Sequence, residues 1–184
     1  DSILPELPTE LGSYALERLR ARGIEFRLET RVVGATANDV ELSDGRRIPT
    51  RSFVWTAGNR PGPLIAGMGG EHAGNGALIT DPSCRVAGLN GVWALGDCAQ
   101  VPDVDNAGTS FPPTAQHALR QGKVVADNIV AVLAGRDPAT FRFRALGLLV
   151  ALGHRTAAAD IRGHQFSGFV AGVLCRGVYV VQLP

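Results

Sequence analysis

Gly96-Asp97 is the pair of residues best placed to bind a ligand, because it directly follows the apolar run Val92-Trp93-Ala94-Leu95. Such a run is typical of a strand buried on both faces of a sheet, and open α/β sheets bind ligands at the carboxyl ends of their strands. Gly96 lets a ligand come close to the backbone, and the Asp97 carboxylate accepts a hydrogen bond from a ligand hydroxyl. Taken alone, the pattern also fits an ordinary turn after a strand.

A second candidate site is the beginning of a helix predicted from Pro113, with Thr114, Ala115 and Gln116 in its first turn. A helix N-terminus offers free N–H groups and about half a positive charge. These groups stabilise an electron-rich ligand, such as the N1/O2 edge of a reduced flavin. The alternative is that the Pro-Pro-Thr segment only begins a packed helix.

The polar face of the same helix offers contacts to an electron acceptor. Gln116 and His117 lie in its first turn, and an imidazole can relay a proton near neutral pH. A histidine in this position is equally consistent with a surface or capping group. We expect Lys123 and Asp127, further along, to lie on a solvated face.

The chain closes with a regular apolar stripe at helical spacing. Its members are Phe166, Phe169, Val170, Val173, Leu174, Gly177, Val178 and Val181. Arg176 interrupts the run, so a spanning helix of about 20 apolar residues is not supported. Two interpretations stay open: a helix lying in a membrane interface with its apolar face down, and plain core packing.

Periodicity and turn residues predict the elements that position these sites. Helices are expected at 9–22, 113–134 and 166–184, and strands at 24–28, 32–37, 52–58, 78–80, 92–95, 146–152 and 156–161. A hairpin pairs 40–42 with 47–48 across Ser43-Asp44-Gly45. The stripe of the middle helix comprises Ala115, Ala118, Leu119, Gly122, Ala126, Ile129 and Leu133.

Composition excludes several classes of protein. The 184 residues are 45% hydrophobic and 19% charged, which is typical of a folded protein with one or two cores. A net charge of +1 with scattered Lys and Arg argues against nucleic-acid binding. Cys84, Cys98 and Cys175 form no C-x-x-C pair, which favours a reducing compartment and predicts neither a zinc site nor a local redox disulfide. His72, His154 and His164 lack ligand spacing, so no metal is expected.

Two features predict that the chain is an internal and C-terminal piece of a longer protein. It opens on Asp1 without a Met and ends at Pro184 inside an apolar run. It also lacks a G-x-G-x-x-G segment, since Gly67-Met68-Gly69-Gly70 is followed by His72 at the sixth position. We therefore expect a bound nucleotide's pyrophosphate to be held outside this chain, and the piece alone to hold flavin poorly and to be inactive.

Four segments, in this order, resemble the two-dinucleotide-binding-domain flavoprotein reductases, and the type II NADH:quinone dehydrogenases in particular. They are Ile3-Leu4-Pro5, Val54-Trp55-Thr56-Ala57-Gly58-Asn59, Ala94-Leu95-Gly96-Asp97 and Pro112-Pro113-Thr114-Ala115-Gln116. The resemblance implies an α/β fold made of partial FAD/NAD(P)-binding Rossmann-like domains, a small antiparallel β-meander and the start of a C-terminal domain. The implied ranges are 1–58 for the NADH-binding part, 59–137 for the FAD-binding part and 138–184 for a membrane-docking part.

The resemblance also implies roles for single residues. Gly96 and Asp97 would hold the ribityl chain of FAD, and Gly58 would belong to the NADH side. Thr114, Ala115 and Gln116 would hold the pyrimidine edge of the flavin. No catalytic residue is assigned within the chain.

The quinone-binding segment of the family, Ala-Gln-x-Ala-x-Gln, matches at Ala115, Gln116 and Ala118. Arg120 stands where the final Gln would be, and Gln121 follows one place later. Gln116, Arg120 and Gln121 are therefore expected to border the acceptor site. Docking on the inner face of a membrane, from the cytoplasm, would use Phe166, Phe169, Val170, Val173 and Leu174.

The activity implied by the resemblance is hydride transfer from NADH or NADPH to FAD, followed by electron transfer to a membrane quinone. One alternative is a soluble FAD-dependent reductase of a protein acceptor such as a ferredoxin. Another is a non-catalytic interaction module with the same fold. A homodimer stays open as an assembly.

Overall fold

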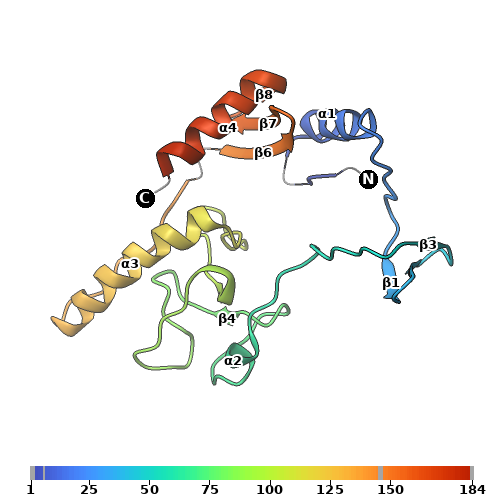
Figure 1. Ribbon diagram of the computed structural model, residues 1–184. Helices are drawn as coiled ribbons and strands as arrows, with labels where there is room; N and C mark the ends of the chain where they lie inside the picture. Colours follow the sequence, from blue (N-terminus) through green and yellow to red (C-terminus); the bar gives the residue numbers. More distant parts are fainter. Residues whose placement is uncertain (1–2, 6, 145–146, 183–184) are drawn as a thin grey trace. The chain divides into compact units, whose positions relative to one another are not determined.

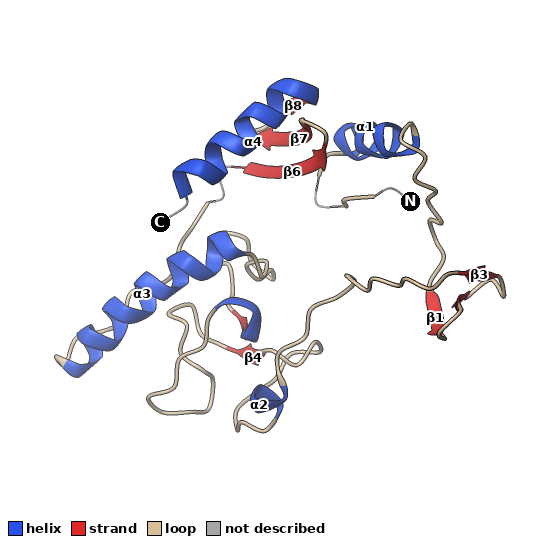
Figure 2. Cartoon of the chain, in the orientation of Figure 1, coloured by secondary structure: helices blue, strands red, loops and turns tan. Residues whose placement is uncertain are grey.

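The computed structural model describes residues 3–5, 7–144 and 147–182 of the chain. It consists of two compact units, Asp1–Trp55 with Ala145–Pro184 and Thr56–Arg144, whose elements are traced in Figures 1 and 2. Helices, short antiparallel sheets and one parallel strand pair alternate along the chain, which confirms the predicted mixed α/β class. The domain ranges expected from the sequence stay predictions.

Helix α1 (Thr9–Arg20) opens the first unit and confirms the first predicted helix. It buries Leu11 and Ala15, which lie one turn apart and therefore share a face. The chain leaves the helix at Gly23, whose φ of +83° is a conformation that glycine adopts without steric cost. The buried face packs on Leu152 and Ala158 of the C-terminal sheet.

The C-terminal sheet has the antiparallel order β6-β7-β8, with β6 (Gly147–Gly153), β7 (Thr156–Ile161) and β8 (His164–Ser167). Helix α4 (Gly168–Gln182) lies along it (Figure 1) and buries Ala171 and Cys175 against Ala157 and Ala159. Small side chains on both surfaces allow this close approach. The predicted strand start at Leu146 and helix end at Pro184 lie outside the described residues.

The prediction that the last helix includes Phe166 is wrong, because Phe166 lies in β8 and pairs with Ala159. Arg162 and Gly163, between β7 and β8, both have positive φ, as a two-residue hairpin turn requires. The turn sends the chain back along the sheet, and the helix begins only at Gly168.

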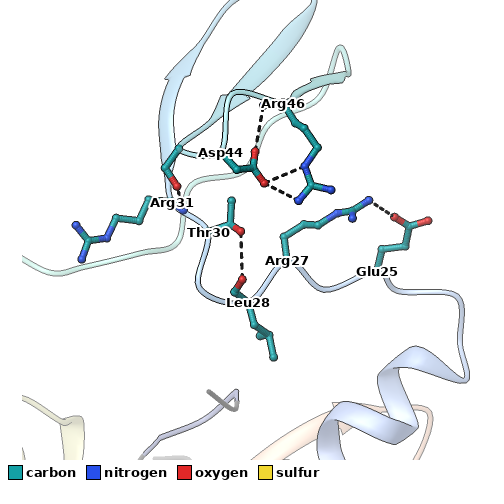
Figure 3. Close-up of polar contacts among 8 residues, drawn as sticks. Glu25, Arg27, Leu28, Thr30, Arg31, Asp44 and Arg46 are labelled. Atoms are coloured by element: carbon teal, nitrogen blue, oxygen red, sulfur yellow. Dashed lines mark hydrogen bonds and ion pairs between the residues drawn. The ribbon is translucent and has the colours of Figure 1, made fainter.

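The predicted β-meander is confirmed as the antiparallel sheet β1-β2-β3, with β1 (Val32–Ala35), β2 (Asp39–Leu42) and β3 (Arg47–Pro49). Val40 and Leu42 alternate into its buried side. Figure 3 shows Arg46 reaching across the hairpin turn to Asp44, with Nε and one terminal nitrogen 2.8 and 2.5 Å from Oδ2. These hydrogen bonds from Arg46 lower the pKa of Asp44.

A strand at 24–28 was expected from alternating apolar and charged residues, and this prediction is wrong. Glu25 and Arg27 lie two residues apart and pair with each other at 3.0 Å (Figure 3). The charged residues of the alternating segment thus form an ion pair with each other. No strand of the described residues supplies the backbone hydrogen bonds that a sheet needs.

The second unit comprises α2 (Pro63–Ala66), β4 (Leu78–Ile79), the 3-10 helix η1 (Gly96–Cys98), β5 (Ala99–Gln100) and α3 (Ala115–Leu133). Strands β4 and β5 pair in parallel. One core cluster gathers Cys84, Val101, Phe111, Val125 and Phe141, and a second gathers Leu78, Val86 and Ala94.

Two predicted apolar strands are absent from the described sheets. The segment 52–58 is exposed throughout, and 81% of Val54 is accessible. The segment 92–95 pairs on one side only, through the hydrogen bonds Val86 N to Val92 O and Ala94 N to Cys84 O, both 3.0 Å. A strand buried on both faces also needs neighbours along both edges, and no described residue provides them here.

Helix α3 confirms the predicted middle helix, although its apolar stripe is not the face that packs within the described residues. Leu119, in the stripe, is 71% exposed. The buried face consists of His117, Gln121, Val125 and Asn128. Two of these side chains, Gln121 and Asn128, are amides that bind backbone groups of the segments opposite them.

Asn128 illustrates these contacts. Its amide nitrogen donates to Ser83 O at 3.1 Å and to Ala139 O at 2.9 Å, and its Oδ1 accepts from Ala139 N at 2.7 Å. One side chain therefore fixes two loops to the helix, and the buried backbone groups of those loops are satisfied.

The contact between α4 and the β6-β7 turn yields a stability prediction. A Cβ at Gly172 would lie 2.3 Å from the carbonyl oxygen of Arg155. Gly172→Ala should therefore push the helix off the sheet and destabilise the fold by about 1–3 kcal/mol, as overpacking does. The measurement is denaturant unfolding of the purified protein.

The matched control is Gly177→Ala, on the same helix, where a Cβ would meet nothing within 4 Å. Alanine there should stabilise the helix by about 0.8–1 kcal/mol, its propensity advantage over glycine. Equal effects of the two substitutions would contradict the packing described for Gly172.

Candidate functional site

The Gly96-Asp97 turn packs directly on the first turns of α3. Gly96 has a φ of +65°, and a Cβ on it would lie 3.2 Å from the Cβ of Ala118. The Gly96 N–H donates to the side-chain oxygen of Gln121 at 2.8 Å. The backbone conformation and the close approach to Ala118 therefore both favour glycine at this position.

The Asp97 carboxylate is exposed beside this junction. Its Oδ2 accepts a hydrogen bond from the Asn59 side-chain amide at 2.6 Å. Asn59 was not among the site residues expected from the sequence, although it directly follows Gly58, which was. This hydrogen bond places Asn59, directly after the 52–58 segment, next to the turn, although Asn59 and Asp97 are 38 positions apart in the sequence.

The N-terminus of α3 has no side-chain cap. Thr114 is the N-cap residue, but its side chain does not cap the helix. Its hydroxyl lies instead 2.7 Å from Nδ1 of His117. The first N–H groups of a helix have no partner within it, so the N–H groups of Ala115 and Gln116 can serve an electron-rich ligand.

Asp97 and the approach to α3 line one open cavity of about 250 Å³. Its lining residues are Asn75, Asp97, Ala99, Gln100, Ser110, Phe111, Pro112 and Pro113. Small-molecule pockets typically measure about 300–1,000 Å³, so the cavity suits part of a dinucleotide. A larger hollow of about 410 Å³ is lined only by residues between Arg20 and Arg27, a single stretch of chain, and we assign it no ligand.

His117 is buried between two aromatic rings. Its ring centroid lies 5.5 Å from that of Phe111 and 5.1 Å from that of Phe143. Burial lowers the pKa of His117, the positive charge of Arg120 lowers it further, and Asp103 opposes both. The imidazole is therefore neutral at pH 7, and the surface-group interpretation of this residue does not hold.

The three residues expected at an acceptor site do not share one environment. Arg120 stacks its guanidinium 4.2 Å from the Phe143 ring centroid and donates to the backbone oxygen of Gln116 at 3.0 Å. Gln116 and Arg120 are half-buried neighbours, one helical turn apart. Gln121 is buried and turned towards Gly96. Gly58 lies in the exposed 52–58 segment.

The cysteines do not form a redox pair. All three are free thiols. Cys84 is buried, and burial with the nearby Asp81 charge raises its pKa to about 11, so the thiol stays protonated. Cys98 Sγ donates to Leu95 O at 3.2 Å. Within the described residues no cluster of His, Cys, Asp and Glu is suited to a metal ion.

Comparisons with known proteins show the family of the chain. Residues 1–122 match the pyridine nucleotide-disulphide oxidoreductase family. Demethylphylloquinone reductase NdbB of Synechocystis is 36% identical over 185 residues, covering 99% of this chain and 45% of the relative. The type II NADH:quinone oxidoreductase Ndh of Mycobacterium tuberculosis is 31% identical, covering 94% of this chain and 38% of the relative.

The fold is similar to that of NDH2 from Plasmodium falciparum, solved in complex with NADH. The TM-score is 0.86 at 15% identity, and the match covers 100% of this chain and 53% of that one. This likeness confirms the predicted Rossmann-like fold class. The chain spans less than half the length of the two curated relatives.

The curated homologues include enzymes of the type that the sequence resemblance implied. The family match covers well over half of the chain, from its first residue to the second turn of α3. The chain therefore belongs to the pyridine nucleotide-disulphide oxidoreductase family.

Proposed function

We propose that this chain is part of a flavoprotein that takes a hydride from NADH or NADPH onto FAD and passes the electrons to a quinone. The observation that carries the proposal is the cavity shared by Asp97 and the approach to α3. A ligand in this cavity would contact the Asp97 carboxylate and lie next to the positive end of α3. The names of the quinone-reducing relatives support the same activity.

The residues of the cavity fit part of an FAD molecule. Asp97, oriented by Asn59, would accept a hydrogen bond from the ribityl chain. Thr114, Ala115 and Gln116, at the start of α3, would stabilise negative charge on the flavin edge. FAD supplies the redox chemistry, and this chain binds and orients it. Gly58, next to Asn59, would face the NADH side.

The acceptor is proposed to reach the face of α3 that carries Gln116 and Arg120. Arg120 is held by the Phe143 ring and by the Gln116 backbone, so its charge is fixed beside the flavin end of the helix. A positive charge there favours the reduced, electron-rich form of an acceptor. The domain ranges 1–58, 59–137 and 138–184 belong to the same proposal.

Helix α4 is proposed to dock the protein on a membrane from the cytoplasmic side. Phe169, Val170, Val173 and Val180 are exposed on it. Exposed apolar groups of this kind mark interaction surfaces, and Arg176, also exposed, offers a charge to lipid headgroups at the edge of the face. Among the described residues, no helix is both long and apolar enough to cross a membrane. A homodimer is a further proposal for the assembly.

Removing the Asp97 carboxylate tests the flavin site. A hydrogen bond to a charged group is worth about 1.5–3 kcal/mol, so Asp97→Ala in the full-length protein should weaken FAD binding about ten- to a hundred-fold. The measurement is a fluorescence titration of the apoprotein with FAD. The control Asp127→Ala removes an exposed carboxylate of α3 and should leave the affinity unchanged.

Unchanged FAD affinity in Asp97→Ala would overturn the assignment of Asp97. The activity itself is tested with wild-type, flavin-loaded protein and a short-chain quinone. Steady NADH oxidation that needs the quinone supports the proposal. Turnover only with a ferredoxin would favour the soluble reductase, and no turnover with either would favour an interaction module.

The buried imidazole of His117 predicts a pH dependence of stability. Because the pKa of His117 is lower in the folded than in the unfolded chain, the unfolded chain binds the proton first as the pH falls. Stability is full above about pH 6.5, the unfolded pKa, and is lost as the pH drops from there towards the folded pKa. His117→Gln removes this contribution and should flatten the slope of the unfolding free energy in that window.

The readout is denaturant unfolding at a series of pH values. His164→Gln, on strand β8, is the control for the loss of an exposed imidazole. The same slope in wild type and His117→Gln would show that His117 is not kept neutral by its surroundings.

Membrane docking is tested with a charge on the exposed face of α4. Val173 is 53% exposed, so Val173→Asp should leave the fold intact and release the full-length protein from lipid vesicles. Translocon-insertion scales put the cost of a charged side chain at about 2.5–3.5 kcal/mol at the bilayer centre. A carboxylate in the shallower interface should therefore weaken binding by up to roughly a hundred-fold. Val33→Asp, at an exposed valine of β1, is the control. Retention of Val173→Asp on vesicles would favour core packing of this face in the full-length protein.

A further inference from the structure

We propose that Gln121 is a positioning residue for the flavin site: its side-chain oxygen holds the Gly96-Asp97 turn in the conformation that presents Asp97 to FAD. The inference rests on the proposed function and assigns to Gln121 a role other than contact with the electron acceptor. It is carried by the hydrogen bond between Gln121 Oε1 and Gly96 N.

The turn needs such a partner because the backbone changes direction at Gly96. Leu95 is extended, with φ −152° and ψ 166°, and Gly96 is left-handed, with φ +65°. Ala94 N–H still donates to Cys84, whereas the Gly96 N–H, two residues later, donates to a side chain of α3. Gln121, only 3% exposed, supplies the acceptor at 2.8 Å. A buried N–H without an acceptor is costly.

Gln121 lies on a different face of α3 from the residues proposed at the acceptor site. Gln116 and Arg120 are four residues apart and form one row of the helix. Gln121 belongs to the adjoining row with His117 and Val125, which is buried. Its oxygen accepts from Gly96, which turns the side chain away from the row that carries Gln116 and Arg120.

Ala118 completes the junction. Its Cβ lies where only a glycine can approach, 3.2 Å from the position of a Cβ at Gly96. Contact with Ala118 sets how closely the turn approaches the helix, and the Gln121 bond sets its orientation. Asp97 directly follows the fixed peptide, so the direction of its carboxylate depends on both.

Asn128 provides a matched comparison on the same helix. It is also a buried amide that binds backbone groups, but its partners are Ser83 and Ala139, not the Gly96-Asp97 turn. Loss of either amide should lower the stability of the apoprotein. Only the loss of Gln121 should also alter how the folded protein binds FAD.

The experiment compares Gln121→Leu, Gln121→Glu and Asn128→Leu in the full-length protein. The melting temperature of each apoprotein is measured first, and its FAD dissociation constant is then measured at a temperature below that transition. Gln121→Leu removes the acceptor and should weaken FAD binding about ten-fold or more. Gln121→Glu keeps a side-chain oxygen at the same reach and should restore most of the affinity. Asn128→Leu should lower the melting temperature and leave the dissociation constant unchanged.

Wild-type FAD affinity in Gln121→Leu would overturn the inference, as would equal loss in the Leu and Glu variants or in Asn128→Leu. If Gln121→Leu is not obtained as folded protein, Gln121→Met fills a similar volume without a strong acceptor and replaces it. Asp97→Ala separates the two proposals. Weakened binding in Asp97→Ala with wild-type binding in Gln121→Leu removes only the role of Gln121, whereas wild-type binding in both removes the flavin site itself.

Discussion

The candidate site depends on one constraint: the turn at Gly96 must lie against the second turn of α3. A left-handed glycine, a small residue at Ala118 and a buried acceptor at Gln121 meet this constraint together. Because the same helix carries Thr114 at its N-terminus and Arg120 nearly two turns further on, docking the turn also fixes Asp97 relative to these groups. In our proposal, ligand binding and acceptor contact are therefore coupled through this one helix.

The sequence predicts elements well where their causes are local. The helix at 9–22, the hairpin across Ser43-Asp44-Gly45 and the middle helix follow from apolar spacing, turn residues and a glycine or proline near the ends. The strands at 52–58 and 92–95 could not be predicted in the same way. Their residues have the right character, but a strand also depends on distant hydrogen-bonding neighbours, which composition does not reveal.

The same distinction between local and long-range causes applies to the candidate site. Asp97 and the start of α3 are recognisable from the sequence because the signal is a short run of residues. Asn59 is not, and for Gln121 the sequence predicts a different role, because the contacts of these two residues lie 38 and 25 positions away. The apolar stripe did not predict the buried face of α3, for a related reason. Buried backbone groups require amide partners, so polar residues occupy the interior and Leu119 stays outside.

Helix α4 separates its residues by size, and this separation bears on what the helix is for. Ala171, Gly172 and Cys175 face the sheet, where a single added methyl at Gly172 would collide with the Arg155 backbone. Phe169 and Val173, which would bury far more apolar area, face outwards. A helix selected only to stabilise this small sheet would gain from the reverse order. The sequence of α4 is instead consistent with two apolar partners. The sheet requires small side chains that allow a close approach, and the other partner, in our proposal a lipid surface, requires a large exposed apolar area.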